Sequence, residues 1–246
     1  MKSIYIAIAI ILITLTASFA YYYFPKTEED GSYLILLIDL TDKDTVELNA
    51  HDVVSLATNS FLSKSEITIQ TESLSEYQTN AVKEFHLPKE GIITGNSMRR
   101  KRAINKLARQ VDTTVRKMYS QQTARSQSKL FLPFLNAVND LSKRNAQTKT
   151  IVCASDLTEN NKAFSCYNPK SIQLLKKDPH LVETTLLQGS SLNNYRGISI
   201  YLIHHPRNER DDEMFYLMAN FYKQLYERKG ATVYIQSDLH IQYNSR

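Results

Sequence analysis

Two apolar runs that each end in an aspartate constrain the fold of this chain more than any other feature. Residues 33–39 read YLILLID, and residues 149–156 read KTIVCASD. An apolar run without polar alternation is typical of a strand that is covered on both faces, as in a parallel sheet between helices. The chain is therefore expected to bury two central strands and to place a carboxylate at the end of each.

The rest of the chain alternates between strand and helix patterns. Further strands are predicted at residues 66–71, 81–87, 197–205 and 231–236, and helices at 48–61, 97–119, 129–144, 171–177, 181–187 and 211–228. This alternation predicts an α/β fold over residues 33–246, a single doubly wound, mostly parallel sheet with helices on both faces. Its crossovers are expected to be right-handed.

The N-terminal segment has the character of a membrane anchor. Residues 4–24 carry no charged side chain, and three tyrosines, at positions 21–23, follow the apolar part. Such a length crosses a hydrocarbon core, and tyrosines favour its interface. We expect residues 1–25 to form a signal anchor, 26–32 a linker, and the domain to face the periplasm or the outside. The alternative is a cleaved signal peptide, with cleavage after Ala20 and a secreted product.

Composition adds few constraints. The formal net charge is only +5, so nucleic acid is not an expected partner. The chain has neither a glycine-rich phosphate loop nor a nucleophile elbow. Cys153 lies in a predicted core strand, where a free thiol behaves as a small apolar group, whereas an exported domain favours its pairing with Cys166. The sequence leaves both states open.

The two strand-end aspartates, Asp39 and Asp156, are expected to meet. In the common strand order 3-2-1-4-5-6, ligands bind beyond the carboxyl ends of strands one and four, where the strand order reverses. Thr41, Ser126 and Ser128 bring hydroxyl groups to the same region. Carboxylate and hydroxyl oxygens suit Mg²⁺, with Mn²⁺ or Ca²⁺ as alternatives, rather than zinc.

This arrangement resembles the von Willebrand factor A domain and its metal-ion-dependent adhesion site. That family uses Asp-x-Ser-x-Ser after its first strand, a threonine from a later loop, and an aspartate after its fourth strand. Here DLTDK supplies Asp39 and Thr41, ASDLTEN supplies Asp156, and either Ser126 or Ser128 supplies the loop hydroxyl. The resemblance extends over residues 32–236 as an order of elements.

The chain departs from the family motif at Lys43, which stands where the second serine belongs. In one interpretation the loop is reshaped and this ammonium points to solvent. In the other it pairs with one of the aspartates, and the site holds no metal.

Basic residues crowd the start of the predicted helix at 97–119. Arg99, Arg100 and Arg102 are the leading residues of this group. They are interpreted either as a solvated helix face or as a docking patch for an acidic partner or lipid headgroups. No aromatic residues are interleaved for base stacking.

The resemblance implies a protein-interaction module rather than an enzyme. A partner's acidic residue would complete the coordination of a cation held by Asp39, Thr41 and Asp156, in a cell-envelope or secretion apparatus. The alternatives are a metal-dependent hydrolase that uses the same carboxylates and a metal-free structural domain. Near this site, Glu159 is expected to support the carboxylates or to cap a helix, and His204 and His205 end the fifth strand.

Overall fold

The computed structural model describes residue 14 and residues 31–41, 45–58, 64–74, 80–91, 96–120 and 128–239. The chain divides into two units, Met1–Asp30 and Gly31–Arg246. The predicted membrane segment lies outside the described residues. Among the helices that are described, none combines the length and the apolar character needed to span a membrane.

The second unit is built on one six-stranded sheet. Its strands are β1 (Gly31–Asp39), β2 (Glu66–Leu74), β3 (Asn80–Leu87), β4 (Thr148–Ala154), β5 (Ile198–Ile203) and β6 (Thr232–Gln236). Their order is β3-β2-β1-β4-β5-β6. All neighbours are parallel except β2 and β3, which pair in antiparallel fashion. The expected strand order and the mostly parallel sheet are therefore confirmed.

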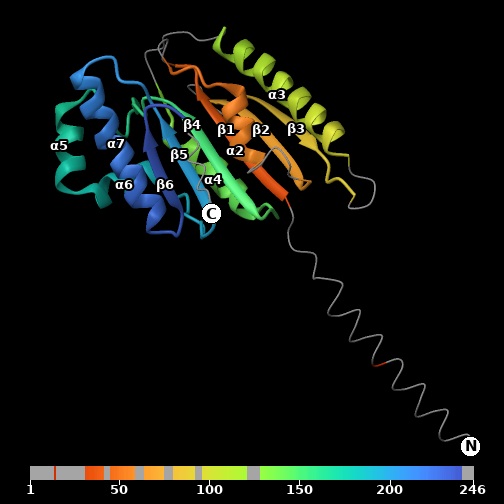
Figure 1. The fold of residues 1–246 in the computed structure, drawn as a ribbon. Helices are drawn as coiled ribbons and strands as arrows, with labels where there is room; N and C mark the ends of the chain where they lie inside the picture. The colour runs from red at the N-terminus through yellow and green to blue at the C-terminus, as the bar shows by residue number, and fades with distance from the viewer. Residues whose placement is uncertain are drawn as a thin grey trace, which may run out of the picture. The chain divides into compact units, whose positions relative to one another are not determined.

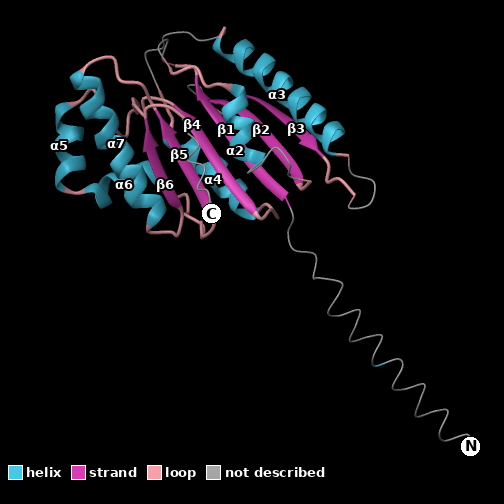
Figure 2. Ribbon diagram, in the orientation of Figure 1, coloured by secondary structure: helices cyan, strands magenta, loops and turns pink. Residues whose placement is uncertain are grey.

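Helices cover both faces of this sheet, as Figures 1 and 2 show. They are α2 (Ala50–Thr58), α3 (Ser97–Tyr119), α4 (Phe131–Lys143), α5 (Pro169–Lys177), α6 (Pro179–Leu187) and α7 (Glu209–Glu227). In Figure 1, α3 lies along β2 and β3, whereas α5, α6 and α7 surround the other end of the sheet.

The sheet separates two layers of the apolar core, and its central strand β1 contributes side chains to both. Leu34, Leu36 and Ile38 pack with α2 and α3 on one face, and alternate residues of β1, such as Ile35 and Leu37, pack with α4 and α7 on the other. Successive side chains of a strand point to opposite faces, so a strand between two helical layers must be apolar throughout. This explains the unbroken apolar run in the sequence.

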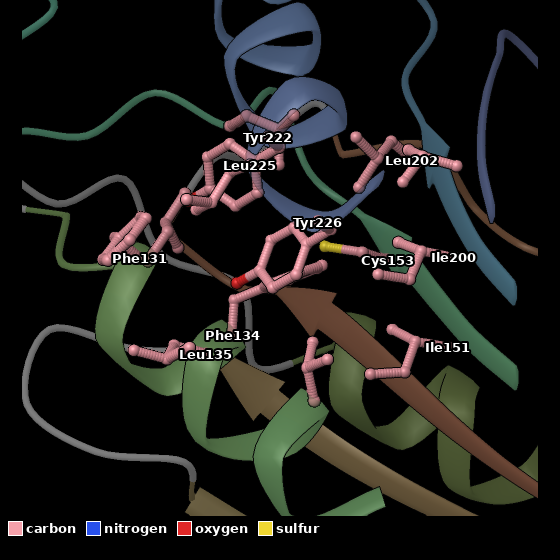
Figure 3. Packing of buried hydrophobic residues seen from close by; sticks show 14 of the residues in the cluster. Phe131, Phe134, Leu135, Ile151, Cys153, Ile200, Leu202, Tyr222, Leu225 and Tyr226 are labelled. Carbon is pink, nitrogen blue, oxygen red and sulfur yellow. The ribbon is translucent and has the colours of Figure 1, made fainter. Parts of the chain in front are cut away.

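Aromatic rings fill the layer between α4 and α7. Phe134 packs edge-on against Tyr222, with ring centroids 5.2 Å apart, and contacts Tyr226 at 5.3 Å. Figure 3 shows these rings close to Cys153. The Cys153 and Cys166 side chains are both buried free thiols, so the structure has the reduced state of the two that the sequence left open.

Candidate functional site

Asp39 is the last residue of β1 and is completely buried. Its Oδ1 accepts hydrogen bonds from the backbone N–H of Thr41 at 2.8 Å and from the Thr41 hydroxyl at 2.7 Å. Its Oδ2 accepts a hydrogen bond from the Ser155 hydroxyl, also at 2.7 Å. Both carboxylate oxygens are therefore occupied by donors from the ends of two neighbouring strands.

Thr41 in turn lies beside Ser128. Their hydroxyl oxygens are 3.2 Å apart. Ser128 is held in place by its backbone, which exchanges two hydrogen bonds with the backbone of Asn160, at 2.8 and 3.2 Å. The segment before α4 is thus joined to the loop after β4, and that pairing carries the Ser128 hydroxyl to the tip of β1.

Asp156 lies two residues beyond the end of β4 and is 9% exposed. One of its oxygens accepts a hydrogen bond from the backbone N–H of Thr158 at 2.8 Å. The intervening Leu157 has a φ of 56°, in the left-handed region that bulky residues rarely adopt. The loop therefore turns sharply directly after the carboxylate that it carries to the crevice.

The electrostatics of the site disfavour two negative charges without a counter-ion. Burial, followed by the negative charge of Asp156, raises the pKa of Asp39 to about 6, and hydrogen bonds from Thr41 and Ser155 oppose the rise. Taking a carboxylate out of water favours its protonated form, and so does a neighbouring carboxylate. A bound cation would relieve both effects.

Glu159 is a second buried carboxylate near this site, at 1% exposure. Its Oε2 accepts hydrogen bonds from the backbone N–H groups of Leu130 and Phe131, each at 2.9 Å. The helix α4 has no capping bond from its own N-cap side chain, and Glu159 caps it instead from the loop after β4. Burial nevertheless raises the pKa of Glu159 to about 7.

The oxygen atoms at the crevice fit a hard divalent cation. The Thr41 hydroxyl donates its hydrogen bond to Asp39. Its oxygen can therefore act only as an acceptor or a ligand toward Ser128 and a bound cation. Thr41, Ser128 and Asp156, which are buried but retain 8–9% exposure, would hold the cation, and Asp39 would orient the Thr41 hydroxyl from behind. Such outer carboxylates commonly fix metal ligands in this way, and Mg²⁺ keeps several waters in sites of this kind.

The described residues contain no group of three or more His, Cys, Asp or Glu side chains that could hold a metal ion. The expected site is of another composition, since it combines two carboxylates with hydroxyl groups.

A cavity of about 300 Å³ adjoins the crevice. Asp156 forms part of its wall, and Arg207 and Arg210 at the start of α7 form another part. Arg207 is held by Asp211, whose Oδ2 lies 3.1 Å from its Nε. The cavity therefore places Arg210, and Arg207 in its ion pair with Asp211, beside the candidate cation site.

The two histidines at the end of β5 differ in their surroundings. His204 is buried, and its Nε2 lies 3.2 Å from Oδ2 of Asp211, so it ties the strand to the first turn of α7. His205 is exposed. Neither is a neighbour of Asp39 in the contacts of the described residues.

The three predicted partner-binding arginines lie at the other edge of the sheet. The Arg100 guanidinium donates hydrogen bonds to the backbone carbonyls of Pro88, at 2.8 Å, and Ser65. Ser65 directly precedes β2, whose first residue pairs with Gly31 at the start of β1. At about 3.3 Å per residue, Asp39 is about 26 Å further along that strand.

Arg100 also requires a correction, because only 2% of it is exposed. Its side chain fastens α3 to the sheet and is not presented to a partner. Arg99 and Arg102 are exposed, and the expectation of a docking surface is kept for these two.

The structure thus brings together Asp39, Thr41, Ser128 and Asp156. Ser126 and Lys43 lie outside the described residues, so the two interpretations of Lys43 both remain. Sequence reasoning missed Ser155, which bonds Asp39 directly; its position next to Asp156, at the same strand end, was the available signal.

The Thr45 hydroxyl donates a hydrogen bond to the backbone carbonyl of Asp39 at 2.8 Å. It thereby anchors the far end of the loop that follows β1.

Comparison with protein-family models gives no match, and comparison with curated proteins gives none either. The functional argument therefore rests on the geometry of the crevice.

Proposed function

We propose that this protein is a membrane-anchored, von Willebrand factor A-like interaction module that recognises an acidic residue of a partner protein through a bound divalent cation. The cation, Mg²⁺ before Mn²⁺ or Ca²⁺, would be held by Thr41, Ser128 and Asp156, with Asp39 behind them. Its charge would make the contact with a partner carboxylate strong and directional.

The observation that carries this proposal is the 3.2 Å approach of the Thr41 and Ser128 hydroxyls, directly in front of the buried Asp39. Neither residue is needed there by the apolar core, because both lie beyond the ends of the secondary-structure elements. Two hydroxyls and two carboxylates from three separate loops meet where the doubly wound fold binds ligands.

The adjoining cavity favours an acidic partner. A carboxylate at the cation would bring neighbouring partner residues next to Arg207 and Arg210, which line that cavity. Complementary charge of this kind speeds association and selects partners.

The test is thermal unfolding of residues 26–246 in EDTA and in rising concentrations of Mg²⁺, Mn²⁺ or Ca²⁺. A cation that binds only the folded state at about a hundred times its Kd stabilises by about 2.7 kcal/mol. For a domain of this size, that corresponds to a rise in Tm of about 5–10 °C. Thr41→Val keeps the shape of the side chain and removes the hydroxyl, so it should abolish most of this rise.

The matched control is Thr184→Val, which removes an exposed hydroxyl that bonds the His180 carbonyl within α6. This variant should keep the full response. A wild-type Tm that is the same in EDTA and in every cation would refute the cation bridge and leave a metal-free docking or structural domain.

A further inference from the structure

The edge of the domain opposite the candidate site carries a concentration of positive charge. We define the amino-edge patch as the exposed residues Lys64, Lys89, Arg99, Lys101 and Arg102. They come from three segments: the approach to β2, the end of β3 and the first turns of α3.

Backbone and side-chain contacts hold these three segments together. The backbone N–H of Glu90 donates to the carbonyl of Lys64 at 2.9 Å. The buried Arg100 joins α3 to both of these segments, through its bonds to Pro88 after β3 and to Ser65 before β2. The patch is therefore built on ordered backbone and is not a chance grouping of long side chains.

The three α3 residues of the patch are not neutralised by ion pairs. Within the described part of the chain, Arg99, Lys101 and Arg102 take part in no ion pair. Of the two acidic residues in the same segments, Glu66 has His86 beside it at 3.7 Å, and Glu90 acts on the buried Arg100. The positive charge of Arg99, Lys101 and Arg102 is thus available to an external anion.

The covalent path of the chain decides what meets this edge. The domain begins at Gly31, which pairs with Glu66 in the register of β1 and β2. The uncharged stretch of the sequence ends at Phe24, and the seven steps to Gly31 span at most about 25 Å. A membrane anchor ending at Phe24 therefore keeps the amino edge close to the bilayer surface.

We infer that the amino-edge patch docks on anionic lipid headgroups of the membrane that holds the N-terminal segment, and that this contact turns the Asp39 crevice away from the bilayer. The inference rests on the membrane attachment that the proposed function includes. Short-range attraction is sufficient, because a charged surface acts within about a Debye length, near 8–10 Å at physiological salt. The N-terminal attachment keeps the patch near the bilayer and so raises the effective concentration of lipid headgroups around it.

Docking at this edge also serves the proposed recognition. The candidate site lies at the opposite ends of the same strands, about 26 Å from the patch along β1. A domain lying with its amino edge on the lipid would present the crevice to a soluble or neighbouring partner, whereas a freely tumbling domain would not.

The test uses the full chain in vesicles of phosphatidylcholine alone and in vesicles that also contain phosphatidylglycerol. A donor dye is attached at Ser97→Cys, at the amino edge, or at Ala163→Cys, in the loop after β4 near the crevice, with an acceptor dye on the lipid. The native thiols are buried and stay unlabelled in the folded protein.

Energy transfer from position 97 should rise in the phosphatidylglycerol vesicles and fall again in 0.5 M salt, while transfer from position 163 stays low. Since each basic residue at an anionic surface strengthens association about fivefold, reversing Arg99, Lys101 and Arg102 to Glu should remove the rise. The matched control reverses Arg109, Arg116 and Lys117, which are exposed toward the other end of α3, and should retain it.

Equal transfer from position 97 in both lipids would overturn the inference, and so would an equal loss in the control variant. Flotation tests the proposed membrane anchor separately from the patch. A chain that does not float with phosphatidylcholine vesicles has no anchor. If such a chain floats with vesicles that contain phosphatidylglycerol, the patch binds anionic lipid without an anchor.

Discussion

The hydroxyl oxygens of Thr41 and Ser128 lie 3.2 Å apart, although one residue follows β1 and the other precedes α4. Asp39 holds the first hydroxyl from behind, and the backbone of Asn160 holds the segment of the second. Within the described residues the pair is the most direct sign of a ligand site, because Asp39 orients the Thr41 hydroxyl and the backbone of Asn160 fixes the position of Ser128.

Replacing Ser128 by Ala should separate ligand binding from stability. Among the described residues the Ser128 hydroxyl makes one contact, the 3.2 Å approach to the Thr41 hydroxyl, so in EDTA its loss should cost about 1 kcal/mol. The rise in Tm with Mg²⁺ should nevertheless fall to less than half that of the wild type. Ser190→Ala, an exposed serine after α6, is the control, and a normal Mg²⁺ response in Ser128→Ala would exclude this hydroxyl as a ligand.

The stability of the metal-free domain should fall as pH rises. The pKa of Glu159 is about 7 in the folded state against an ordinary value of 4.5, so between these pH values the folded state retains a proton that the unfolded state has lost. Asp39 acts in the same direction between pH 3.8 and about 6. Each group contributes at most about 1.4 kcal/mol per pH unit.

This pH dependence is measured by urea unfolding in EDTA from pH 4.5 to 8. Glu159→Gln should flatten the part of the curve between pH 5 and 7. Saturating Mg²⁺ should reduce the loss at high pH, because a cation binds the ionised carboxylates. A wild-type stability that increases from pH 5 to 7 in EDTA would contradict the prediction.

Glu159→Ala should weaken the start of α4. The substitution leaves the N–H groups of Leu130 and Phe131 without their acceptor, which should lower the free energy of unfolding by about 1–3 kcal/mol. Amide hydrogen exchange at these two residues should accelerate more than exchange in the middle of α4. Glu159→Gln keeps one acceptor oxygen and should lose less; equal losses in the two variants would argue against capping.

Arg100→Met should destabilise the domain, whereas Arg99→Met should not. The first removes a buried guanidinium together with its hydrogen bonds to the carbonyls of Pro88 and Ser65, at a cost of about 1–3 kcal/mol. The second changes an exposed side chain and should remain within about 0.5 kcal/mol of the wild type. Urea unfolding of both variants checks the difference, and similar values would show that Arg100 does not fasten α3 to the sheet.

Much of the fold could be predicted because it depends on local patterns. The apolar runs of β1 and β4 and the helical spacing between them indicate a parallel sheet with two covered faces. From that topology follows the meeting of Asp39 and Asp156, since parallel strands all present their carboxyl ends at one edge. The antiparallel direction of β3 was not predicted, although only residues 75–79 separate it from β2, and a connection that short joins antiparallel neighbours.

The sequence did contain a signal for the burial of Arg100. The apolar stripe of α3 begins at Ile104, and one helical turn earlier the same face falls on Arg100 and not on its basic neighbours. The interpretation as a uniform basic patch overlooked this spacing.

What the sequence by itself determined is the alternation of strands and helices and, with the common strand order of doubly wound folds, the edge at which the two aspartates lie. Only the tertiary structure decided that Ser155 bonds Asp39, that Ser128 contacts Thr41, and that Glu159 caps α4. The reason is physical: periodicity is a property of neighbouring residues, whereas these contacts join loops that are distant in the chain and meet only once both helical layers have packed on the sheet.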